Sequence, residues 1–318
     1  MKALAIVGPT ASGKTALSLA LGTCYDCEII CCDSMQVYRG MDIGTAKPTA
    51  AEQAVLPHHL LDIKDPDEAY SAADYGRDAL QVAAEVAGRG RLPLFCGGTG
   101  LYIEAVRTLR HEHAPPADPL IRAQLQRTAE SQAGRDTLYR ILSSVDPESA
   151  AAIHPNNIRR VIRALEIYQT TGLPKSHWDR QSAGANPAME LLVLGLRFQD
   201  RELLYRRIDS RVEQMLAQGL LEETNALLDK GLLSPAYTAG QAIGYKELAR
   251  YLRGEMSFAD AVQSLKTATR HYAKRQMTWF SAQPDIVWID CDQEGTLRPP
   301  AALEQEAQTA IDPFLQNA

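Results

Sequence analysis

The stretch Gly8-Pro9-Thr10-Ala11-Ser12-Gly13-Lys14-Thr15 constrains the fold most, because it has the glycine, lysine and hydroxyl spacing of a phosphate-binding loop. Residues 3–7 before it form an apolar run typical of a buried strand, and residues 16–21 after it have the composition of a helix. In such a loop, inward N–H groups, a lysine and the positive end of the following helix bind an anion. The sequence therefore predicts a site for a diphosphate or triphosphate. The residues expected to bind it are Gly8, Thr10, Ala11, Ser12, Gly13, Lys14 and Thr15, and the Thr15 hydroxyl is the expected ligand of Mg²⁺.

The length and composition place limits on the class of protein. The chain has 318 residues, a net charge of −6 and 45% hydrophobic residues, which is the composition of an ordinary soluble protein. No apolar run approaches the ~20 residues that span a bilayer. The apolar run after Met1-Lys2 is too short for a signal peptide and is needed as the first strand. We therefore expect a cytoplasmic protein with two lobes.

Six cysteines, at positions 24, 27, 31, 32, 96 and 291, are too few and too clustered for a disulfide scaffold. The spacing of Cys24, Cys27, Cys31 and Cys32 also permits a zinc site. Because Cys31 and Cys32 fall in an apolar run typical of a strand, we favour burial of these cysteines as small side chains.

Two further predicted strands end in polar residues. Residues 28–32 form one strand, which is followed by Asp33. Residues 92–96 form another, which is followed by the glycine turn Gly97-Gly98-Thr99-Gly100 and a helix. In an open α/β sheet the carboxyl ends of the strands line the ligand crevice, so we expect Asp33 and Thr99 beside the phosphate loop. The alternative for the glycine turn is a tight turn that touches no ligand.

Several shorter patterns predict local structure. Residues 39–48 contain glycine and proline breakers and predict a loop, and His58-His59 predicts the end of a loop and the start of a strand, where neighbouring side chains point apart. Ser71 and Asp74 fit a capping box at the start of a helix that runs to about Arg89.

Helical periodicity dominates from Pro119 to about Thr171, after a hinge-like stretch at 111–118. We expect an inserted helical lobe at 116–185 within a catalytic core formed by 1–115 and 186–318. Residues 191–196 and 286–290 predict the last two strands, and the residues beyond them predict a polar helix or a frayed end. The expected fold class is therefore α/β, with a P-loop-type parallel sheet flanked by helices.

Three basic segments accompany this core. The first is Arg159 to Arg163 in the lobe, and the second is a predicted helix at 203–228, with Arg207 and Arg211 on one face. The third is a helix with no acid between Val262 and Gln283, in which the aromatic residues Tyr272, Trp279 and Phe280 lie among lysines and arginines. Basic side chains bind the phosphates of single-stranded nucleic acid, and aromatic rings stack on its bases, so this helix is suited to bind such a strand.

Taken together, these features resemble the bacterial tRNA dimethylallyltransferase family. The resemblance spans residues 8 to 280 in order. Besides the phosphate loop and the glycine turn, it rests on the blocks at 33–38, 42–48, 57–63, 70–74, 154–157, 163–166, 242–247 and 273–276.

The resemblance implies transfer of a dimethylallyl group from dimethylallyl diphosphate to the exocyclic N6 amine of the adenosine 3′-adjacent to the tRNA anticodon. Asp33 would be the general base, Thr99 would orient the bridging oxygen, and Arg211, with or without Arg207, would hold the diphosphate. The choice between the two arginines stays open. The implied cofactor is Mg²⁺, the implied partners are tRNA and the diphosphate, and we expect a monomer.

The resemblance also implies a set of tRNA-contacting residues, with the lobe gripping the anticodon stem. They are Asp33, Ser34, Met35, Gln36, Thr99, Arg122, Asn157, Ile158, Arg159, Arg160, Val161, Gly240, Gln241, Ala242, Ile243, Gly244, Tyr245, Ala273, Lys274, Arg275, Gln276, Met277, Thr278, Trp279 and Phe280.

Two rival functions follow from the same residues. A small-molecule or nucleoside kinase would bind ATP in the phosphate loop and use Asp33 to activate a hydroxyl. A nucleotide-driven RNA-binding switch would bind RNA tightly without needing Asp33.

Overall fold

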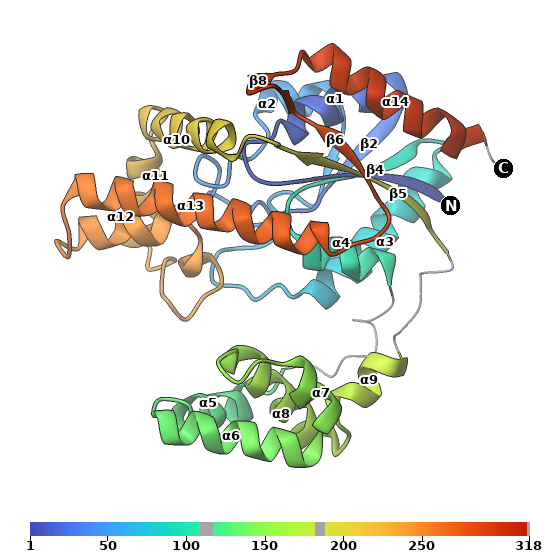
Figure 1. Cartoon of the computed structure of the whole chain (residues 1–318). Helices are drawn as coiled ribbons and strands as arrows, with labels where there is room; N and C mark the ends of the chain where they lie inside the picture. Colours follow the sequence, from blue (N-terminus) through green and yellow to red (C-terminus); the bar gives the residue numbers. More distant parts are fainter. Residues whose placement is uncertain (109–116, 182–187, 317–318) are drawn as a thin grey trace. The chain divides into compact units, whose positions relative to one another are not determined.

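The structure is a computed structural model, which describes residues 1–108, 117–181 and 188–316. Its centre is a six-stranded sheet with the order β3-β2-β4-β1-β5-β6, and every pairing in it is parallel (Figure 1). The parallel α/β fold class predicted from the sequence is confirmed, as is each predicted strand. The strands are β1 (Lys2–Val7), β2 (Cys27–Cys31), β3 (His58–His59), β4 (Leu92–Cys96), β5 (Glu190–Arg197) and β6 (Ile286–Asp290).

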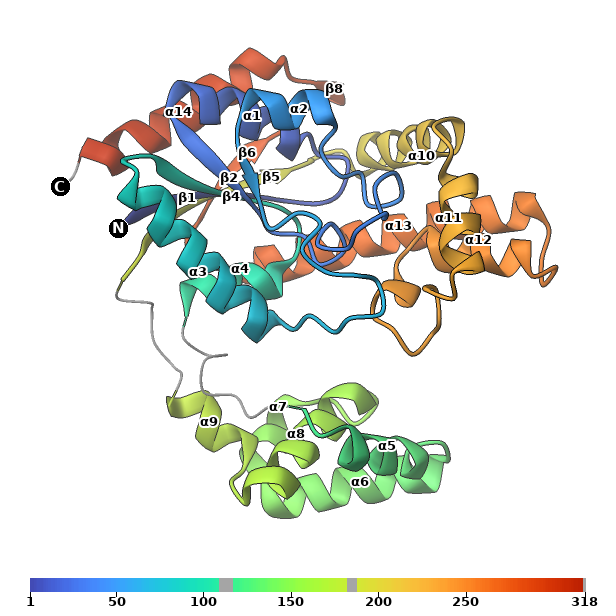
Figure 2. The ribbon, with the colours of Figure 1, turned by 180° about the vertical axis from the view of Figure 1, so that it is seen from behind.

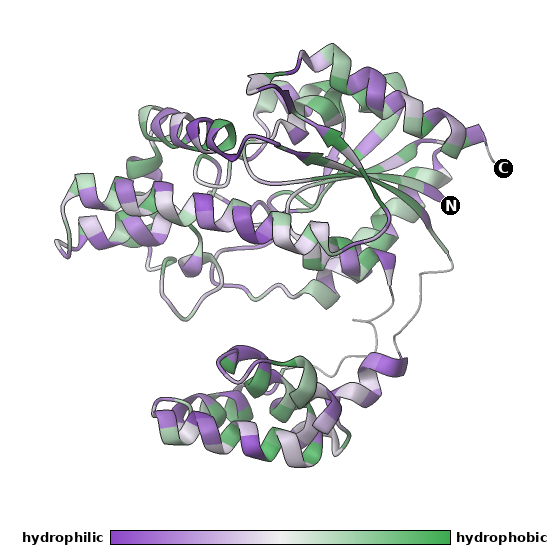
Figure 3. Cartoon of the chain, in the orientation of Figure 1, coloured by the Kyte–Doolittle hydropathy of each residue, from purple (hydrophilic) through white to green (hydrophobic). Residues whose placement is uncertain are grey.

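The central strands are continuous apolar runs because helices cover both faces of the sheet. Residues 3–7 of β1 are fully buried between β4 and β5. Helices α1 (Lys14–Cys24) and α14 (Pro300–Gln316) lie side by side on one face, while α3 (Ala72–Gly88) and α13 (Phe258–Ser281) lie on the other (Figures 1 and 2). Figure 3 shows the result, with hydrophobic strands inside helices that carry both hydrophobic and hydrophilic residues.

Local signals fix several helix ends. The capping box predicted for α3 is confirmed, since the Ser71 hydroxyl accepts the Asp74 N–H and the Asp74 carboxylate accepts the Ser71 N–H, both at 3.1 Å. The prediction of one helix over 203–228 is wrong. The chain forms α10 (Arg201–Ala217) and α11 (Leu220–Asp229), because Gly219 takes a φ of 104° and ends the first helix.

The remaining elements of the core extend this frame. Residues 39–48 form no helix or strand, as predicted, and α2 (Ala50–Val55) follows them. A 3₁₀ turn, Ala239–Gln241, precedes α12 (Tyr245–Leu252). The hairpin β7 (Asp292–Gln293) and β8 (Thr296–Leu297) was not predicted, and the tail forms α14, in which Ala307 and Ile311 are buried.

The chain divides into two compact units, one of Met1–Ile103 with Pro187–Ala318 and the other of Glu104–Asn186. The expected helical lobe at 116–185 falls inside the second unit. Its two limits lie in 109–116 and 182–187, outside the described residues, as does most of the expected hinge at 111–118. The helices of this unit are the second half of α4 (Gly100–Arg107), α5 (Pro119–Thr128), α6 (Gln132–Val145), α7 (Pro147–Ala152), α8 (Ile158–Thr171) and α9 (Lys175–Gln181).

The second unit has its own apolar core, beside which a carboxylate is buried. Leu142 and Val161 are fully buried in an apolar cluster of α5, α6 and α8. Glu166 is fully buried and accepts the Asp118 N–H at 2.8 Å and the guanidinium groups of Arg122 and Arg163 at 2.8 and 3.0 Å. Arg122, expected to contact tRNA, thus also neutralises this carboxylate.

Cys27, Cys31 and Cys32 are buried, which confirms the interpretation of these three as core residues, whereas Cys24 is exposed. Among the described residues, no three His, Cys, Asp or Glu side chains gather as metal ligands would. Within residues 1–108, 117–181 and 188–316, we found no helix with the length and apolar character needed to cross a bilayer.

Candidate functional site

The first glycine loop, Gly8–Thr15, connects β1 to α1 as the sequence predicts. Gly8 has a φ of 143°, and a Cβ there would lie 2.7 Å from the Leu196 carbonyl oxygen, so only glycine fits. Gly13, the N-cap residue of α1, has no side chain to cap the helix, so a bound anion can accept the first N–H groups. Within the described part of the chain, the buried Ser12 hydroxyl has no hydrogen-bond partner. These features give the loop the properties of an anion site.

Lys14 folds back over this loop. Its Nζ donates to the carbonyl oxygens of Gly8 and Pro9 at 3.1 and 2.7 Å. The pKa of Lys14 is lowered to about 8, chiefly by burial. The positive charge of Arg211 contributes to this shift, and the negative charge of Asp33 opposes it. Lys14 is therefore a cation already close to the loop that a phosphate group would occupy.

Asp33 follows β2 at the same edge of the sheet, as predicted. Its carboxylate accepts the Met35 N–H at 2.9 Å. Burial raises the pKa of Asp33 above its ordinary value, and the charges of Lys14 and Arg211 partly counter the shift. Asp33, Lys14 and Arg211 therefore interact electrostatically, although they lie far apart in the sequence.

The second glycine loop, Gly97–Gly100, follows β4 and lies against the Asp33 segment. The Thr99 hydroxyl accepts the Ser34 N–H at 3.1 Å, and the Thr99 N–H donates to the Cys32 carbonyl at 3.2 Å. A Cβ at Gly97 would lie 2.0 Å from the Cys32 oxygen, so glycine is required for this approach. The expected proximity of Thr99 to Asp33 is present in the structure.

The two arginines of α10 have different surroundings. Arg207 donates from Nε to the Ala11 carbonyl at 2.9 Å and so braces the first glycine loop. Burial lowers the pKa of Arg211, and the negative charge of Asp33 opposes that shift. Both cations therefore lie at the site, with Arg207 fixed to the loop and Arg211 in the field of Asp33.

Gln276 on α13 joins the two glycine loops. Its Oε1 accepts the Thr10 N–H at 2.9 Å, and its Nε2 donates to the Gly98 carbonyl at 2.8 Å. A Cβ at Gly98 would lie 2.0 Å from this Nε2. This bridge was not predicted from the sequence. The available signal was an amide on the same helical face as Ala273 and Phe280, both of which are fully buried.

The residues expected to contact tRNA divide by exposure. Side chains available at the surface are those of Asn157, Arg159, Arg160, Gln241, Lys274, Arg275 and Thr278. Partly exposed are Asp33, Ser34, Met35, Gln36, Thr99, Arg122, Ile158, Ile243, Met277 and Trp279. Buried in this structure are Val161, Gly240, Ala242, Gly244, Tyr245, Ala273, Gln276 and Phe280.

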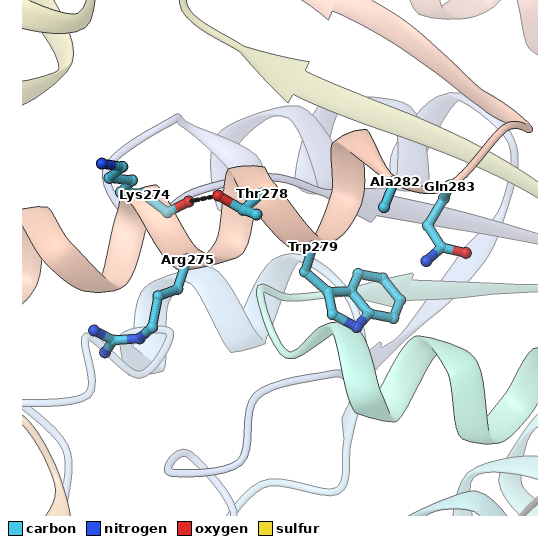
Figure 4. A pocket seen from close by; sticks show the side chains of 6 residues that line it. All are labelled: Lys274, Arg275, Thr278, Trp279, Ala282 and Gln283. Atoms are coloured by element: carbon cyan, nitrogen blue, oxygen red, sulfur yellow. Dashed lines mark hydrogen bonds between the residues drawn. The ribbon is translucent and has the colours of Figure 1, made fainter. Parts of the chain in front are cut away.

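The exposed side of α13 carries an open pocket of about 490 Å³. Figure 4 shows Lys274 and Arg275 at one end and the indole of Trp279 further along the helix. The other lining residues are Thr278, Ala282 and Gln283. Two cations beside an aromatic ring can take a phosphate and a flat base together.

Comparison with known proteins supports the family resemblance inferred from the sequence motifs. The model of the family described as IPP transferase matches residues 36–283. A tRNA dimethylallyltransferase of Geobacillus kaustophilus is 49% identical over 294 residues, which cover 92% of this chain and 92% of that protein. One of Trichlorobacter lovleyi is 46% identical over 288 residues, covering 91% of this chain and 93% of the relative.

Solved structures of similar proteins share the fold. The crystal structure of a tRNA isopentenylpyrophosphate transferase from Bacillus halodurans matches with a TM-score of 0.71 at 44% identity, over 99% of this chain and 97% of that one. A eukaryotic dimethylallyltransferase acting on tRNA matches with a TM-score of 0.81 at 29% identity, over 99% of this chain and 80% of that chain. The family predicted from the sequence is confirmed, and the chain belongs to the IPP transferase family.

Proposed function

We propose that this enzyme transfers a dimethylallyl group from dimethylallyl diphosphate to the N6 amine of the adenosine 3′-adjacent to the anticodon in tRNA, with release of diphosphate. Its family membership supports the reaction class. The observation that carries the assignment of roles is the gathering of Asp33, Lys14 and Arg211 at the first glycine loop.

Asp33 acts as the general base. The adenine amine is a weak nucleophile because its lone pair is delocalised into the ring, so loss of its proton must accompany attack. The new bond forms between N6 and the first carbon of the prenyl group, while the bond from that carbon to the diphosphate oxygen breaks. Burial raises the pKa of Asp33, which makes its carboxylate a better proton acceptor, and the cations Lys14 and Arg211 favour its ionised form.

The diphosphate leaving group is stabilised by the first glycine loop. The N–H groups at the start of α1, the Lys14 ammonium and Arg211 meet the charge that develops as the bond breaks. Arg207 holds the loop in shape through Ala11. The Thr99 hydroxyl, positioned by Ser34 and Cys32, orients the bridging oxygen.

The residues present fit a magnesium ion held mainly by the diphosphate and water. The described residues offer no cluster of three protein ligands, and Thr15 lies in the first turn of α1, where its hydroxyl can add one ligand. Mg²⁺ commonly takes few protein ligands besides substrate phosphates. When bound, it neutralises charge on the leaving diphosphate.

The proposed tRNA contacts use the exposed side chains. On α13, Lys274 and Arg275 bind phosphates, and Trp279 offers a ring to a base. On α8, Arg159 and Arg160 are exposed cations for the anticodon stem. The target adenine must leave its stack to reach Asp33, which is base flipping. A cytoplasmic monomer is the proposed working form, and sedimentation of the enzyme with and without tRNA checks its size.

A kinase is the second candidate that the glycine loops alone would permit. The decisive assay incubates unmodified tRNA, Mg²⁺ and the enzyme with radiolabelled dimethylallyl diphosphate, and a parallel tube contains ATP and a small acceptor. Label on adenosine without ATP supports prenyl transfer. ATP turnover without labelled tRNA would replace it with phosphotransfer.

A further inference from the structure

The carboxylate of Glu223, in the first turn of α11, collects hydrogen bonds from an irregular loop on another part of the core. Both oxygens accept the Ile43 N–H, at 3.1 and 2.9 Å, and they accept the N–H groups of Asp42 and Gly44 at 3.1 Å each. The Tyr245 hydroxyl donates to the same carboxylate at 2.6 Å. A hydrogen bond from a neutral donor to a carboxylate is stronger than a hydrogen bond between two neutral groups. One side chain thus holds three successive backbone amides and a phenol.

The loop held by Glu223, residues 39–48, is in turn bonded to the segment 33–36 that begins with Asp33. Gln36 donates from Nε2 to the carbonyl oxygens of Thr45 and Ala46 at 3.0 and 3.1 Å. Because residues 39–48 form no helix or strand, these side-chain bonds replace a regular backbone ladder. Glu223 is therefore linked to the segment 33–36, which is predicted to contact RNA, by hydrogen bonds through the loop backbone and Gln36.

The phenol links Glu223 to a second segment. Tyr245 is fully buried and ends the stretch 240–245, which was also expected to contact tRNA. The loop also packs on the Tyr245 ring, since a Cβ at Gly44 would lie 2.5 Å from it. Glu223 and Tyr245 therefore fix the spacing between the segments 33–36 and 240–245.

We propose that Glu223 is a positioning residue that sets the relative placement of these two tRNA-contacting segments. It acts through the amides of 42–44 and through Tyr245, and touches neither tRNA nor diphosphate. The inference rests on the proposed function, since it assigns both segments to the tRNA. The inference predicts that loss of Glu223 weakens tRNA binding and leaves diphosphate binding unchanged. The reason is that the hydrogen bonds of Glu223 to residues 42–44 and Tyr245 do not involve the first glycine loop.

The test compares Glu223→Gln with Glu222→Gln, in which the neighbouring acid of the same helix is changed. The amide introduced at position 223 would keep one acceptor and turn its NH₂ group toward the backbone donors. At saturating dimethylallyl diphosphate, the KM for tRNA should rise about tenfold in Glu223→Gln, the usual effect of one charged hydrogen bond. The dissociation constant for dimethylallyl diphosphate should stay unchanged, and Glu222→Gln should match the wild type in both.

A second variant controls for misfolding. Tyr245→Phe keeps the buried ring and removes only the hydroxyl group, so it should raise the KM for tRNA roughly threefold to tenfold without changing donor binding. Wild-type KM for tRNA in both folded variants would overturn the inference, as would equal loss of tRNA and donor affinity. Filter binding of tRNA without the donor gives the same comparison. If the wild type binds tRNA but transfers no prenyl group, the proposed function fails while this comparison still decides the role of Glu223.

Discussion

The side-chain oxygen of Gln276 accepts the backbone N–H of Thr10 at 2.9 Å, and so ties α13 to the first glycine loop. The other end of the same amide bonds the Gly98 carbonyl in the second loop. The helix that carries Lys274, Arg275 and Trp279 outward is thus fixed on its buried side to both loops. The helix proposed to contact tRNA and the proposed diphosphate site are therefore joined through one side chain.

Replacing Gln276 by Ala tests this connection. The variant leaves the Thr10 N–H and the Gly98 carbonyl without their partner and should lower the free energy of unfolding by about 1–3 kcal/mol. The KM for dimethylallyl diphosphate should rise, because Thr10 belongs to the first glycine loop, which is proposed to bind the diphosphate. Urea denaturation and donor titration measure both, with Thr278→Ala on the exposed side of α13 as control. Wild-type values for both quantities would show that the bridge has no role in the site.

Asp33→Ala should reduce turnover by roughly 10²–10⁴-fold, the usual effect of a positioned base. Binding of tRNA and of dimethylallyl diphosphate should persist, because the other contacts of the site remain. Single-turnover transfer and equilibrium binding separate the two effects. Turnover close to wild type would remove Asp33 from the role of base.

Asp33→Asn should increase stability at neutral pH. Since burial raises the pKa of Asp33, the folded protein holds the proton more tightly than the unfolded chain, and ionisation of Asp33 costs folding free energy above the folded pKa. The stability advantage of Asp33→Asn should shrink as the pH falls through the raised pKa and vanish below the ordinary value near 3.9. Melting curves of both proteins between pH 4 and 8 measure it. A stability difference between the two proteins that stays constant across this pH range would contradict the raised pKa of Asp33.

Donor capture should weaken in alkaline solution. Because the pKa of Lys14 is lowered to about 8, its ammonium is lost as the pH rises through that value in the free enzyme. We expect kcat/KM for dimethylallyl diphosphate to fall above about pH 8, and we expect Lys14→Ala to show a low value without that fall. The measurement is the pH profile of both proteins from roughly pH 7 to 9.5, which brackets that pKa. A profile of Lys14→Ala parallel to that of the wild type would assign the titration to another group.

Lys274→Ala should weaken tRNA binding mainly through charge. Loss of one phosphate contact reduces the slope of log K against log salt concentration by about 0.7–1. Thr278→Ala, an uncharged change in the same pocket, should keep the wild-type slope. Filter binding at several salt concentrations gives the slopes. An unchanged slope for Lys274→Ala would move the phosphate contact away from this pocket.

The sequence predicts those parts of the molecule that depend on short stretches. The strand, glycine loop and helix at 2–24 follow from local pattern, as do the Ser71 cap and the placement of Asp33 and Thr99 at strand ends. The break between α10 and α11 was missed because Gly219 lies in a continuous helical pattern and a glycine there is tolerated in many helices.

Long-range bridges were beyond reach for a different reason. The Gln276 and Glu223 side chains meet partners that lie 266 and 180 positions away, and no periodic pattern records such a pairing. Both are polar groups on partly or fully buried positions, which mark them as needing a partner but do not identify it. The same limit applies to Tyr245, which is fully buried and packs against Gly44, about 200 positions away in the sequence.

The most direct test of the central claim follows the position of the transferred group. A tRNA with adenosine 3′-adjacent to the anticodon, and the same tRNA with guanosine there, are incubated with the enzyme, Mg²⁺ and labelled dimethylallyl diphosphate in the absence of ATP. The proposed function predicts N6-dimethylallyladenosine at that one position of the first tRNA, diphosphate released in equal amount, and no label in the second. Label in both tRNAs, or in neither, would contradict it.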